Sequence, residues 1–282
     1  MYKILQKRRL NKESVDMLIE APYVAEKAKP GQFIIFRVNE IGERVPLTVA
    51  GVDKERGGVR IIFQEVGRST MELGAKEEGE YIQDFVGPLG KASELEQFKG
   101  KKIAVIGGGL GAAIAYPVCK AAHDLGADVD MIAGFRNKDI IILEEEMKAN
   151  SSRCFITTDD GSNGTKGFCS DILRQLIDEG TQYDHAIVIG PMIMMKVTCD
   201  LTAQHNIPTT VSMNTIMIDG TGMCGCCRLT VGGETKFACV DGPDFDGHQV
   251  DFAEAMARSR IYAEQEKHDK EAHICNLTGE VR

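Results

Sequence analysis

The chain has 282 residues, of which 43% are hydrophobic, enough for two globular domains and a small third unit. Its formal net charge of −9 and the lack of any Lys/Arg block argue against nucleic acid or an anionic membrane as a partner. No apolar run is long enough to span a bilayer, and the N-terminal stretch MYKILQKRRLNKES lacks the apolar core of a signal peptide. We therefore expect a cytoplasmic protein whose nine cysteines are thiols or metal ligands rather than disulfides.

Residues 1–97 predict an antiparallel β-barrel. Short apolar runs, QFIIFRV, PLTVAGV and VRIIFQEV, are separated by turn clusters such as KPGQ and DKERGG. Several short strands joined by Gly-rich turns are typical of a small barrel.

Residues 98–213 predict an α/β domain with a parallel sheet. A buried strand at 103–106 begins a series in which strands alternate with segments of helical pattern, one of them IIILEEEMKAN at 140–150. This alternation is typical of parallel strands with helices on the faces of the sheet.

Residues 214–247 predict a small Gly- and Cys-rich module with two short strands, CRLTV at 227–231 and KFACV at 236–240. Residues 248–282 form a charged tail with a helical pattern. We therefore expect four segments, of which the third carries most of the unusual chemistry.

Four cysteines lie between positions 224 and 239. Cys224 and Cys227 form a C-x2-C pair, and Cys239 follows after eleven residues. The plant-type 2Fe–2S pattern is C-x4-C-x2-C…C, and here Asp219 stands where the first cysteine would be. The spacing predicts a 2Fe–2S cluster on Asp219, Cys224, Cys227 and Cys239.

Other interpretations of this loop stay open at the level of sequence. Three cysteines and a carboxylate could bind zinc, which accepts Asp oxygen in a tetrahedral site. The thiols could also be uncoordinated, with Asp219-Gly220 serving only as a turn. Cys226 is expected to point away from the ligands. The five remaining cysteines are expected to be isolated, buried small hydrophobes: Cys119, Cys154, Cys169, Cys199 and Cys275.

A glycine loop, Gly107 to Ala112, follows the first strand of the α/β domain and fits G-x-G-x-x-A. Such glycines let the backbone approach a pyrophosphate at a helix N-terminus. The next strand ends in Gly134-Phe135-Arg136, without an acidic residue to hold a ribose. The loop therefore indicates a nucleotide domain of another lineage than the Rossmann dehydrogenases, or a turn that serves only helix–strand packing.

The order of barrel, glycine-loop domain and cluster loop resembles the ferredoxin–NADP reductase superfamily. Within it, the chain resembles the electron-transfer subunits of dihydroorotate dehydrogenase and, more narrowly, the small (beta) subunits of NADH-dependent reduced ferredoxin:NADP oxidoreductase, also called sulfide dehydrogenase. The dihydroorotate relatives have four cysteines in this loop, whereas Asp219 replaces the first one here. Besides the cluster loop, the resemblance is carried by AKPGQF (28–33), ERVPLT (43–48), QEVGRST (64–70), GPLGK (87–91), IGGGLGAA (106–113), GFRNKD (134–139), TTDDGSNGTKGF (157–168) and GPMIMMK (190–196).

The resemblance implies FAD in the barrel. The family motif R-x-Y-S/T corresponds to Val45–Thr48, so Val45 stands at the Arg position and Leu47 at the Tyr position. Arg44 lies one residue before the motif position. The residues implied for FAD are Arg44, Val45, Pro46, Leu47, Thr48, Ile62, Phe63, Gln64, Gly67, Ser69 and Thr70.

The resemblance also implies a pyridine-nucleotide site in the α/β domain. Phosphates would lie at Gly108, Gly109, Leu110 and Gly111, adenosine near Gly134, Arg136, Asp159, Asp160 and Gly161, and nicotinamide near Gly190 and Pro191. Arg136 and Lys138 could bind a 2′-phosphate, so the residues leave NAD or NADP open, while the resemblance favours NAD(H).

The implied function is electron transfer between NAD(H), FAD and the 2Fe–2S cluster, with no catalytic residue for an organic substrate. The implied partner is a larger subunit with its own flavin and iron–sulfur clusters, in a heterodimer that reaches ferredoxin through that subunit and performs flavin-based electron bifurcation. Two alternatives are an electron-transfer subunit of an NAD-dependent dihydroorotate dehydrogenase and a non-enzymatic interaction module organised by zinc.

Overall fold

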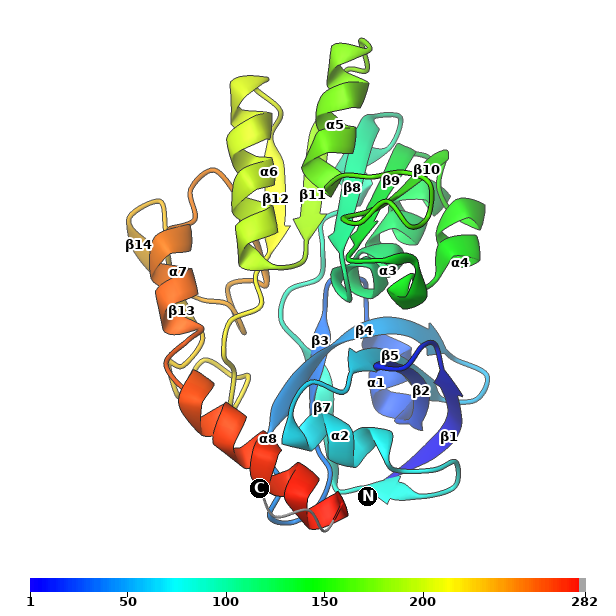
Figure 1. Ribbon diagram of the computed structural model, residues 1–282, viewed down its shortest axis with the longest axis vertical. Helices are drawn as coiled ribbons and strands as arrows, with labels where there is room; N and C mark the ends of the chain where they lie inside the picture. Colours follow the sequence, from blue (N-terminus) through cyan, green and yellow to red (C-terminus); the bar gives the residue numbers. More distant parts are fainter. Residues whose placement is uncertain (279–282) are drawn as a thin grey trace.

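The N-terminal unit is a seven-stranded antiparallel sheet that curls into a near-closed barrel, with strand order β6-β1-β2-β5-β4-β3-β7 (Figure 1). The computed structural model describes residues 1–278, and side chains as far as residue 272. The elements of this unit are β1 (Tyr2–Arg9), β2 (Ser14–Glu20), α1 (Pro22–Lys27), β3 (Phe33–Arg37), β4 (Val45–Asp53), β5 (Gly58–Gln64), α2 (Arg68–Gly74), β6 (Tyr81–Ile82) and β7 (Asp84–Leu89).

Successive side chains of the barrel strands point to opposite faces of the sheet, and in β5 both faces are apolar. In β5, the side chains of Ile61 and Phe63 are buried in the barrel core with Phe36 and Phe85. Ile62 lies between them in the sequence and belongs instead to the core of the second unit. Because successive side chains point to opposite faces of a strand, the same strand serves the barrel core and the contact with the next unit.

The second unit is a six-stranded sheet with the order β10-β9-β8-β11-β12-β15, where β15 is the short strand Asp244–Asp246. Strands β8 to β12 are parallel, and β15 pairs antiparallel with β12 at the edge. Helices α3 and α4 contribute to the core on one face, and α5 and α6 to the core on the other. The elements are η1 (Glu96–Phe98), β8 (Lys102–Gly108), α3 (Gly111–Asp124), β9 (Asp128–Phe135), η2 (Lys138–Ile140), α4 (Glu144–Ala149), β10 (Arg153–Thr158), α5 (Cys169–Asp178), β11 (His185–Ile189), α6 (Met192–Gln204) and β12 (Thr209–Ser212).

One predicted helix is shorter than expected. The helix predicted over 140–150 begins only at Glu144, because Leu143 before it has a left-handed conformation with φ +56°. Ile140 is the last residue of the short helix η2, and the Ile142 side chain is buried in the core of the second unit.

The Gly- and Cys-rich segment joins the second unit rather than standing apart from it. Its hairpin consists of β13 (Arg228–Val231) and β14 (Glu234–Phe237), and β15 (Asp244–Asp246) is the edge strand of the six-stranded sheet. The predicted strand 236–240 is therefore observed two residues earlier, since the chain turns after Phe237. The predicted boundaries at 97, 213 and 247 remain predictions.

Two helices follow the hairpin, α7 (Phe252–Arg258) and α8 (Ala263–Thr278). Helix α8 runs from the cluster segment down to the barrel, where it contacts α2 (Figure 1). The last residues of the predicted tail, 279–282, and the side chain of Cys275 lie outside the described residues.

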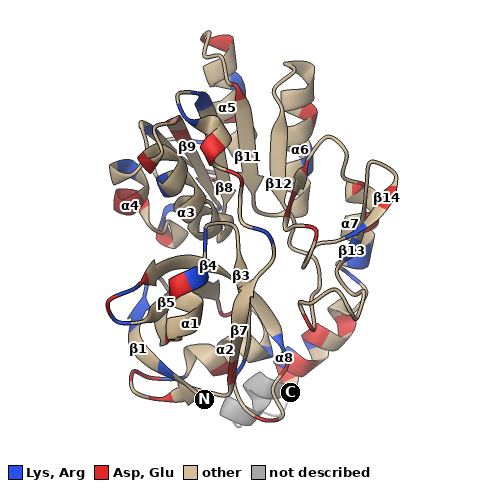
Figure 2. Ribbon diagram, turned by 180° about the vertical axis from the view of Figure 1, so that it is seen from behind, with Lys and Arg blue, Asp and Glu red and all other residues tan. Residues whose placement is uncertain are grey.

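Charged residues of both signs are interspersed over both units, as Figure 2 shows. Among the described residues, no helix is both long enough and apolar enough to cross a membrane.

Candidate cofactor cleft and cluster loop

A cleft of about 1100 Å³ lies between the barrel and the parallel sheet. Barrel strands β3 to β5 form one wall, and the carboxyl ends of β8, β9 and β11 form the other. The predicted cofactor residues that line it are Pro46, Leu47, Thr48, Ile62, Gln64, Gly108, Gly109, Leu110, Gly111, Gly134, Arg136, Asp159, Gly190 and Pro191.

The strand order explains why the cleft opens here. The chain reverses its direction of winding between β8 and β11, which are neighbours in the sheet. Loops diverge at such a switch point and leave a crevice at the carboxyl ends of the strands. Gly109 has φ +57°, and a Cβ on it would meet no atom within 4 Å. This glycine therefore presents bare backbone to open space, as a loop that approaches a pyrophosphate requires.

On the barrel wall, alternation decides which predicted residues reach the cleft. Ile62 and Gln64 line it, whereas the Phe63 side chain between them is buried in the barrel core and cannot. Val45 likewise packs against the barrel core, and Pro46 to Thr48 line the cleft.

The predicted phosphate-binding hydroxyls near α2 lie outside the cleft lining. Ser69 Oγ donates to Glu43 Oε2 at 2.8 Å, and Thr70 Oγ1 accepts from the Gly67 amide at 3.1 Å. The Thr70 hydroxyl therefore satisfies an amide at the start of α2, where a helix has no internal acceptor for it.

Two residues of the predicted adenosine side also lie outside the lining. Asp160 is exposed and accepts from the Ser162 amide at 2.9 Å, and hydrogen bonds from Ser162 lower the pKa of Asp160. Gly161 has φ +78° and completes this turn after β10. Only Asp159 of the three faces the cleft.

Arg44 contacts the cluster loop instead of the cleft. Its Nε donates to the Ile218 carbonyl at 2.8 Å, and its Nη2 donates to the Asp219 carbonyl at 3.3 Å. Both hydrogen bonds direct the guanidinium toward a segment 174 residues away, and the predicted contact of Arg44 with FAD stays a prediction.

The cluster loop brings two predicted ligands into direct contact. The Sγ atoms of Cys227 and Cys239 lie 3.2 Å apart, and both residues are buried. The β13–β14 hairpin makes this contact, since Cys227 precedes its first strand and Cys239 follows its second. The Ala238 amide donates to the Cys227 carbonyl at 3.2 Å and ties the two ends together.

The other two predicted ligands, Asp219 and Cys224, are joined through the Cys224 backbone amide. Asp219 Oδ2 accepts from the Cys224 amide at 2.6 Å, and Oδ1 accepts from the Thr221 hydroxyl at 2.8 Å. Hydrogen bonds from the Thr221 amide and hydroxyl and from Cys224 hold the pKa of Asp219 well below its usual range. Between them, Gly220 has φ +78° and lies so close to the barrel that a Cβ would meet Ile35 at 2.7 Å.

This pairwise arrangement fits a binuclear cluster. A 2Fe–2S cluster takes two protein ligands on each iron, and the loop presents Cys227 with Cys239 and Asp219 with Cys224. Two sulfurs on one tetrahedral metal lie about 3.8 Å apart for bonds of about 2.3 Å, so the cysteine pair needs only a small opening. Over residues 1–272, no three His, Cys, Asp or Glu side chains already lie close enough together to hold one metal ion.

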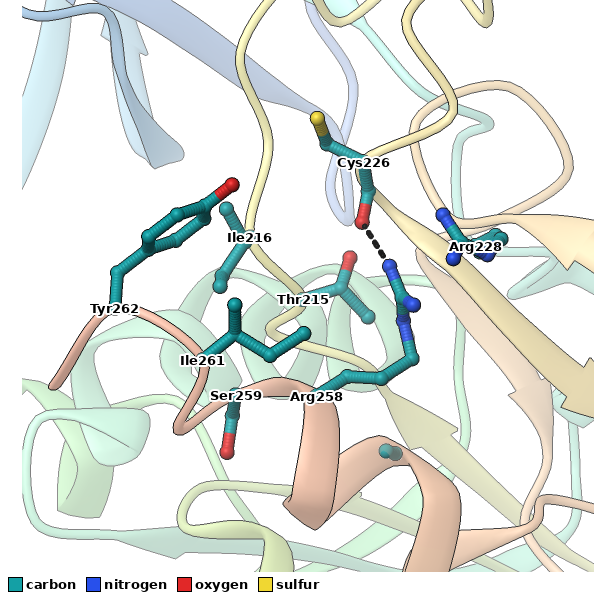
Figure 3. Close-up of a pocket in the computed structure, with 9 residues that line it drawn as sticks. Thr215, Ile216, Cys226, Arg228, Arg258, Ser259, Ile261 and Tyr262 are labelled. Atoms are coloured by element: carbon teal, nitrogen blue, oxygen red, sulfur yellow. Dashed lines mark hydrogen bonds between the residues drawn. The ribbon is translucent and has the colours of Figure 1, made fainter.

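Cys226 lies between the two predicted ligands of the C-x2-C pair, and burial together with a hydrogen bond to the Cys224 thiol raises the pKa of its own thiol. Figure 3 shows its carbonyl directed at Arg258 and its sulfur on the opposite side, away from the pocket drawn there. Burial raises the pKa of the Cys119, Cys169 and Cys199 thiols to about 12, which keeps them protonated at neutral pH.

The part of the cleft that follows β12 was not predicted from the sequence. Met213, Asn214, Thr215 and Met217 line it and lead directly into the cluster loop. Their position after the last parallel strand was a usable signal, because ligands bind at such strand ends. Cys169, assigned only as a core residue, also lines the cleft.

The comparison with protein families supports an iron–sulfur assignment. Residues 214–251 match the iron–sulfur cluster binding domain of dihydroorotate dehydrogenase B. This match contains all four predicted ligands.

Whole-chain relatives extend the similarity. A homolog of the electron transfer subunit of dihydroorotate dehydrogenase B (NAD⁺) from Thermotoga maritima is 44% identical over 94% of this chain and 92% of its own length. A solved NADH-dependent reduced ferredoxin-NADP oxidoreductase, studied for flavin-based electron bifurcation, is 42% identical with a TM-score of 0.90 over 97% of this chain and 98% of that chain.

A more distant structure shares the fold alone. The cytochrome P450 reductase of Amycolatopsis is 16% identical, with a TM-score of 0.60 over 73% of this chain and 66% of its own. The predicted fold class, a barrel with a parallel-sheet nucleotide domain and a C-terminal iron–sulfur segment, is confirmed.

Proposed function

Because this chain belongs to the family of dihydroorotate dehydrogenase B electron-transfer subunits, we propose that it carries electrons between NAD(H) and a larger partner subunit of a bifurcating ferredoxin:NADP oxidoreductase. The predicted oxidoreductase class and its cofactors, FAD, a 2Fe–2S cluster and NAD(H), are confirmed at the level of the family. An electron-transfer subunit implies a larger catalytic partner. The heterodimer, the bifurcation and the link to ferredoxin are the proposed part.

The observation that carries the proposal is the continuity of cleft and cluster loop. Met213 to Thr215 and Met217 line the cleft, and the carbonyls of the next residues, Ile218 and Asp219, accept hydrogen bonds from Arg44. Arg44 in turn precedes Pro46 to Thr48 on the barrel wall. Short covalent and hydrogen-bonded connections thus join the cofactor cleft to the predicted iron ligands.

The cleft residues divide naturally between two nucleotides. Gly108 to Gly111 and the α3 N-terminus would hold the NAD(H) phosphates, with Arg136 and Asp159 on the adenosine side and Gly190 and Pro191 by the nicotinamide. Leu47, Thr48 and Gln64 would hold the flavin ring, where the Thr48 hydroxyl can donate a hydrogen bond to its edge. When bound, FAD supplies the exchange between two-electron and one-electron steps.

The predicted cluster ligands, Asp219 with three cysteines, support a subunit of a bifurcating oxidoreductase over a subunit of dihydroorotate dehydrogenase. A carboxylate is a harder ligand than a thiolate, and ligand identity is one means by which a protein sets the potential of a cluster. By resemblance, the dihydroorotate relatives have cysteine where Asp219 stands. Dihydroorotate oxidation remains the alternative, because the relatives of this family are named for it.

The test uses the full chain, purified anaerobically. One sample is the chain alone, and the other is its complex with the co-expressed partner subunit. We expect flavin absorption bands, about two irons per chain, and NADPH oxidation coupled to NAD⁺ and ferredoxin reduction in the complex. Oxidation of dihydroorotate by the complex would favour the alternative. One zinc per chain without iron–sulfur absorption would overturn the cluster assignment.

A further inference from the structure

Three arginines surround the cluster loop and donate only to its backbone carbonyls. Arg44 reaches Ile218 and Asp219 from the barrel, at 2.8 and 3.3 Å. Arg258, the last residue of α7, donates from Nη2 to the Cys226 carbonyl at 3.1 Å (Figure 3). Arg228 Nη1 donates to the Gly225 carbonyl at 3.3 Å.

These guanidinium groups have no carboxylate partner among the described residues. Arg8, Arg9, Arg37, Arg60, Arg68 and Arg153 all form ion pairs with Asp or Glu. The three loop arginines form none. Over residues 1–272, none of the three has a carboxylate oxygen within 4 Å, although the whole chain carries a net charge of −9.

Arg44 and Arg258 contact the cluster loop from other parts of the fold, at positions at or next to predicted ligands. Arg44 holds the segment of Asp219, and Arg258 holds the residue between Cys224 and Cys227. Both arginines are partly buried, whereas Arg228 is exposed at the rim. Since water screens an exposed charge, Arg44 and Arg258 act more strongly on a group inside the loop than Arg228 does.

Their effect on a cluster has a definite sign. With three thiolates, one carboxylate and two sulfides, a 2Fe–2S cluster is anionic, and it gains one more negative charge when it accepts an electron. Nearby cations stabilise the reduced form more than the oxidised form. Net charge and hydrogen bonding around a cluster are among the factors that set its potential.

We infer that Arg44 and Arg258 are positioning residues that hold the cluster loop by its carbonyls and raise the reduction potential of the cluster. This inference rests on the proposed function, which provides the cluster. It assigns to Arg44 a role in the electron path rather than in binding of FAD.

The experiment compares Arg44→Gln and Arg258→Gln with Arg44→Lys and Arg258→Lys in the full chain. Glutamine keeps an N–H donor and removes the charge, while lysine keeps the charge. The matched control is Arg174→Gln, an exposed arginine on α5, a helix that Figure 1 shows at the end of the second unit away from the barrel and the cluster loop. The readouts are iron content, flavin absorbance and the midpoint potential from an EPR-monitored titration.

At an ambient potential equal to the wild-type midpoint, we expect the ratio of reduced to oxidised cluster to fall about tenfold in each glutamine variant, which corresponds to about 59 mV for one electron. We expect the lysine variants to stay within about twofold of the wild type, and Arg228→Gln to lie between. The ratio of reduced to oxidised cluster should fall further in the double variant, Arg44→Gln with Arg258→Gln, than in either single variant.

Glutamine variants with full iron content and an unchanged potential would overturn the inference. So would lysine variants that shift as far as the glutamine variants. If a glutamine variant loses its iron, the lysine variant at the same position decides: retained iron with a wild-type potential supports the inference, and loss in both overturns it. A wild-type chain without iron would contradict the proposed function instead.

Discussion

The sulfur atoms of Cys227 and Cys239 lie 3.2 Å apart although eleven residues separate the two cysteines in the sequence. A hairpin of two four-residue strands closes this distance. The contact provides the first prediction, because two buried thiols at this separation can bind one iron with little rearrangement.

We expect Cys224→Ser, Cys227→Ser and Cys239→Ser to abolish the cluster signal while FAD stays bound, because the cleft walls are formed mainly by other elements. Cys226→Ser is the matched control and should keep the cluster, since the predicted spacing does not use Cys226 as a ligand and serine can keep a hydrogen bond to the Cys224 thiol. EPR spectra and iron content check this. Loss of iron in Cys226→Ser with retention in Cys227→Ser would show that the ligand register is wrong.

Replacing Asp219 tests the carboxylate as a ligand. We expect Asp219→Cys to keep the cluster and shift its midpoint potential, because thiolate is a softer and more covalent ligand. Asp219→Ala should make the cluster labile and also release the amide of Cys224 from its acceptor. An Asp219→Cys chain with an unchanged potential and EPR spectrum would remove Asp219 from the ligand set.

Gly109 tests the nucleotide assignment. Asn tolerates positive φ better than other residues, so Gly109→Asn fills the open space above the loop with limited strain. We expect NAD(H) binding to weaken by about tenfold or more, equivalent to about 1.4 kcal/mol, with an unchanged flavin spectrum. Gly79→Asn is the control, because Gly79 also has positive φ and open space but lies outside the cleft lining. Equal loss of FAD in Gly109→Asn would mean that the two nucleotides are assigned to the wrong walls.

Asp130 tests a structural role within the nucleotide unit. Its fully buried carboxylate accepts from Lys102 at 2.6 Å, from Arg153 at 2.9 Å and from Tyr183 at 2.6 Å. Although burial opposes it, hydrogen bonding by Arg153, Lys102 and Tyr183 lowers the pKa of Asp130. Asp130→Asn should reduce the free energy of unfolding by about 1–3 kcal/mol, because Arg153 loses its carboxylate partner and Lys102 keeps only Asp128.

The control for that substitution is Asp128→Asn. Asp128 also pairs with Lys102, at 2.9 Å, but its side chain is 56% exposed. We expect Asp128→Asn to lower the free energy of unfolding by less than about 1 kcal/mol, as measured by urea unfolding. Similar losses in both variants would contradict the role assigned to the buried carboxylate.

His185 predicts a pH dependence of stability. Burial lowers its pKa from 6.5 to about 4, and its Nε2 lies 2.8 Å from Thr210 Oγ1. The folded pKa is below the unfolded one, so the unfolded chain binds more protons between these values. The free energy of unfolding therefore falls as the pH drops below about 6.5, by about 2 kcal/mol at pH 5.

Urea unfolding of the wild type and His185→Gln at pH 7 and pH 5 checks this prediction. The variant should show a smaller loss between the two pH values, because glutamine does not titrate. An equal loss in both proteins would assign the pH dependence to other groups.

The sequence alone determined the local features of this protein. The C-x2-C pair with Cys239, the glycine loop after a buried strand and the alternation of strands and helices all concern residues that are near one another in the chain. Turn geometry, strand ends and hairpins convert such spacing directly into position. The barrel, the parallel sheet and the position of the glycine loop at the end of a buried strand could therefore be predicted.

Only the tertiary structure decided contacts that depend on how the units pack. Arg44, one residue from a flavin motif, binds a loop 174 residues away, and Phe63 is buried in the barrel core while its neighbours face the cleft. Strand β15 of the cluster segment completes the nucleotide sheet. Such contacts arise because burial and hydrogen bonding are satisfied over the whole molecule, and no local spacing encodes the orientation of one unit toward another.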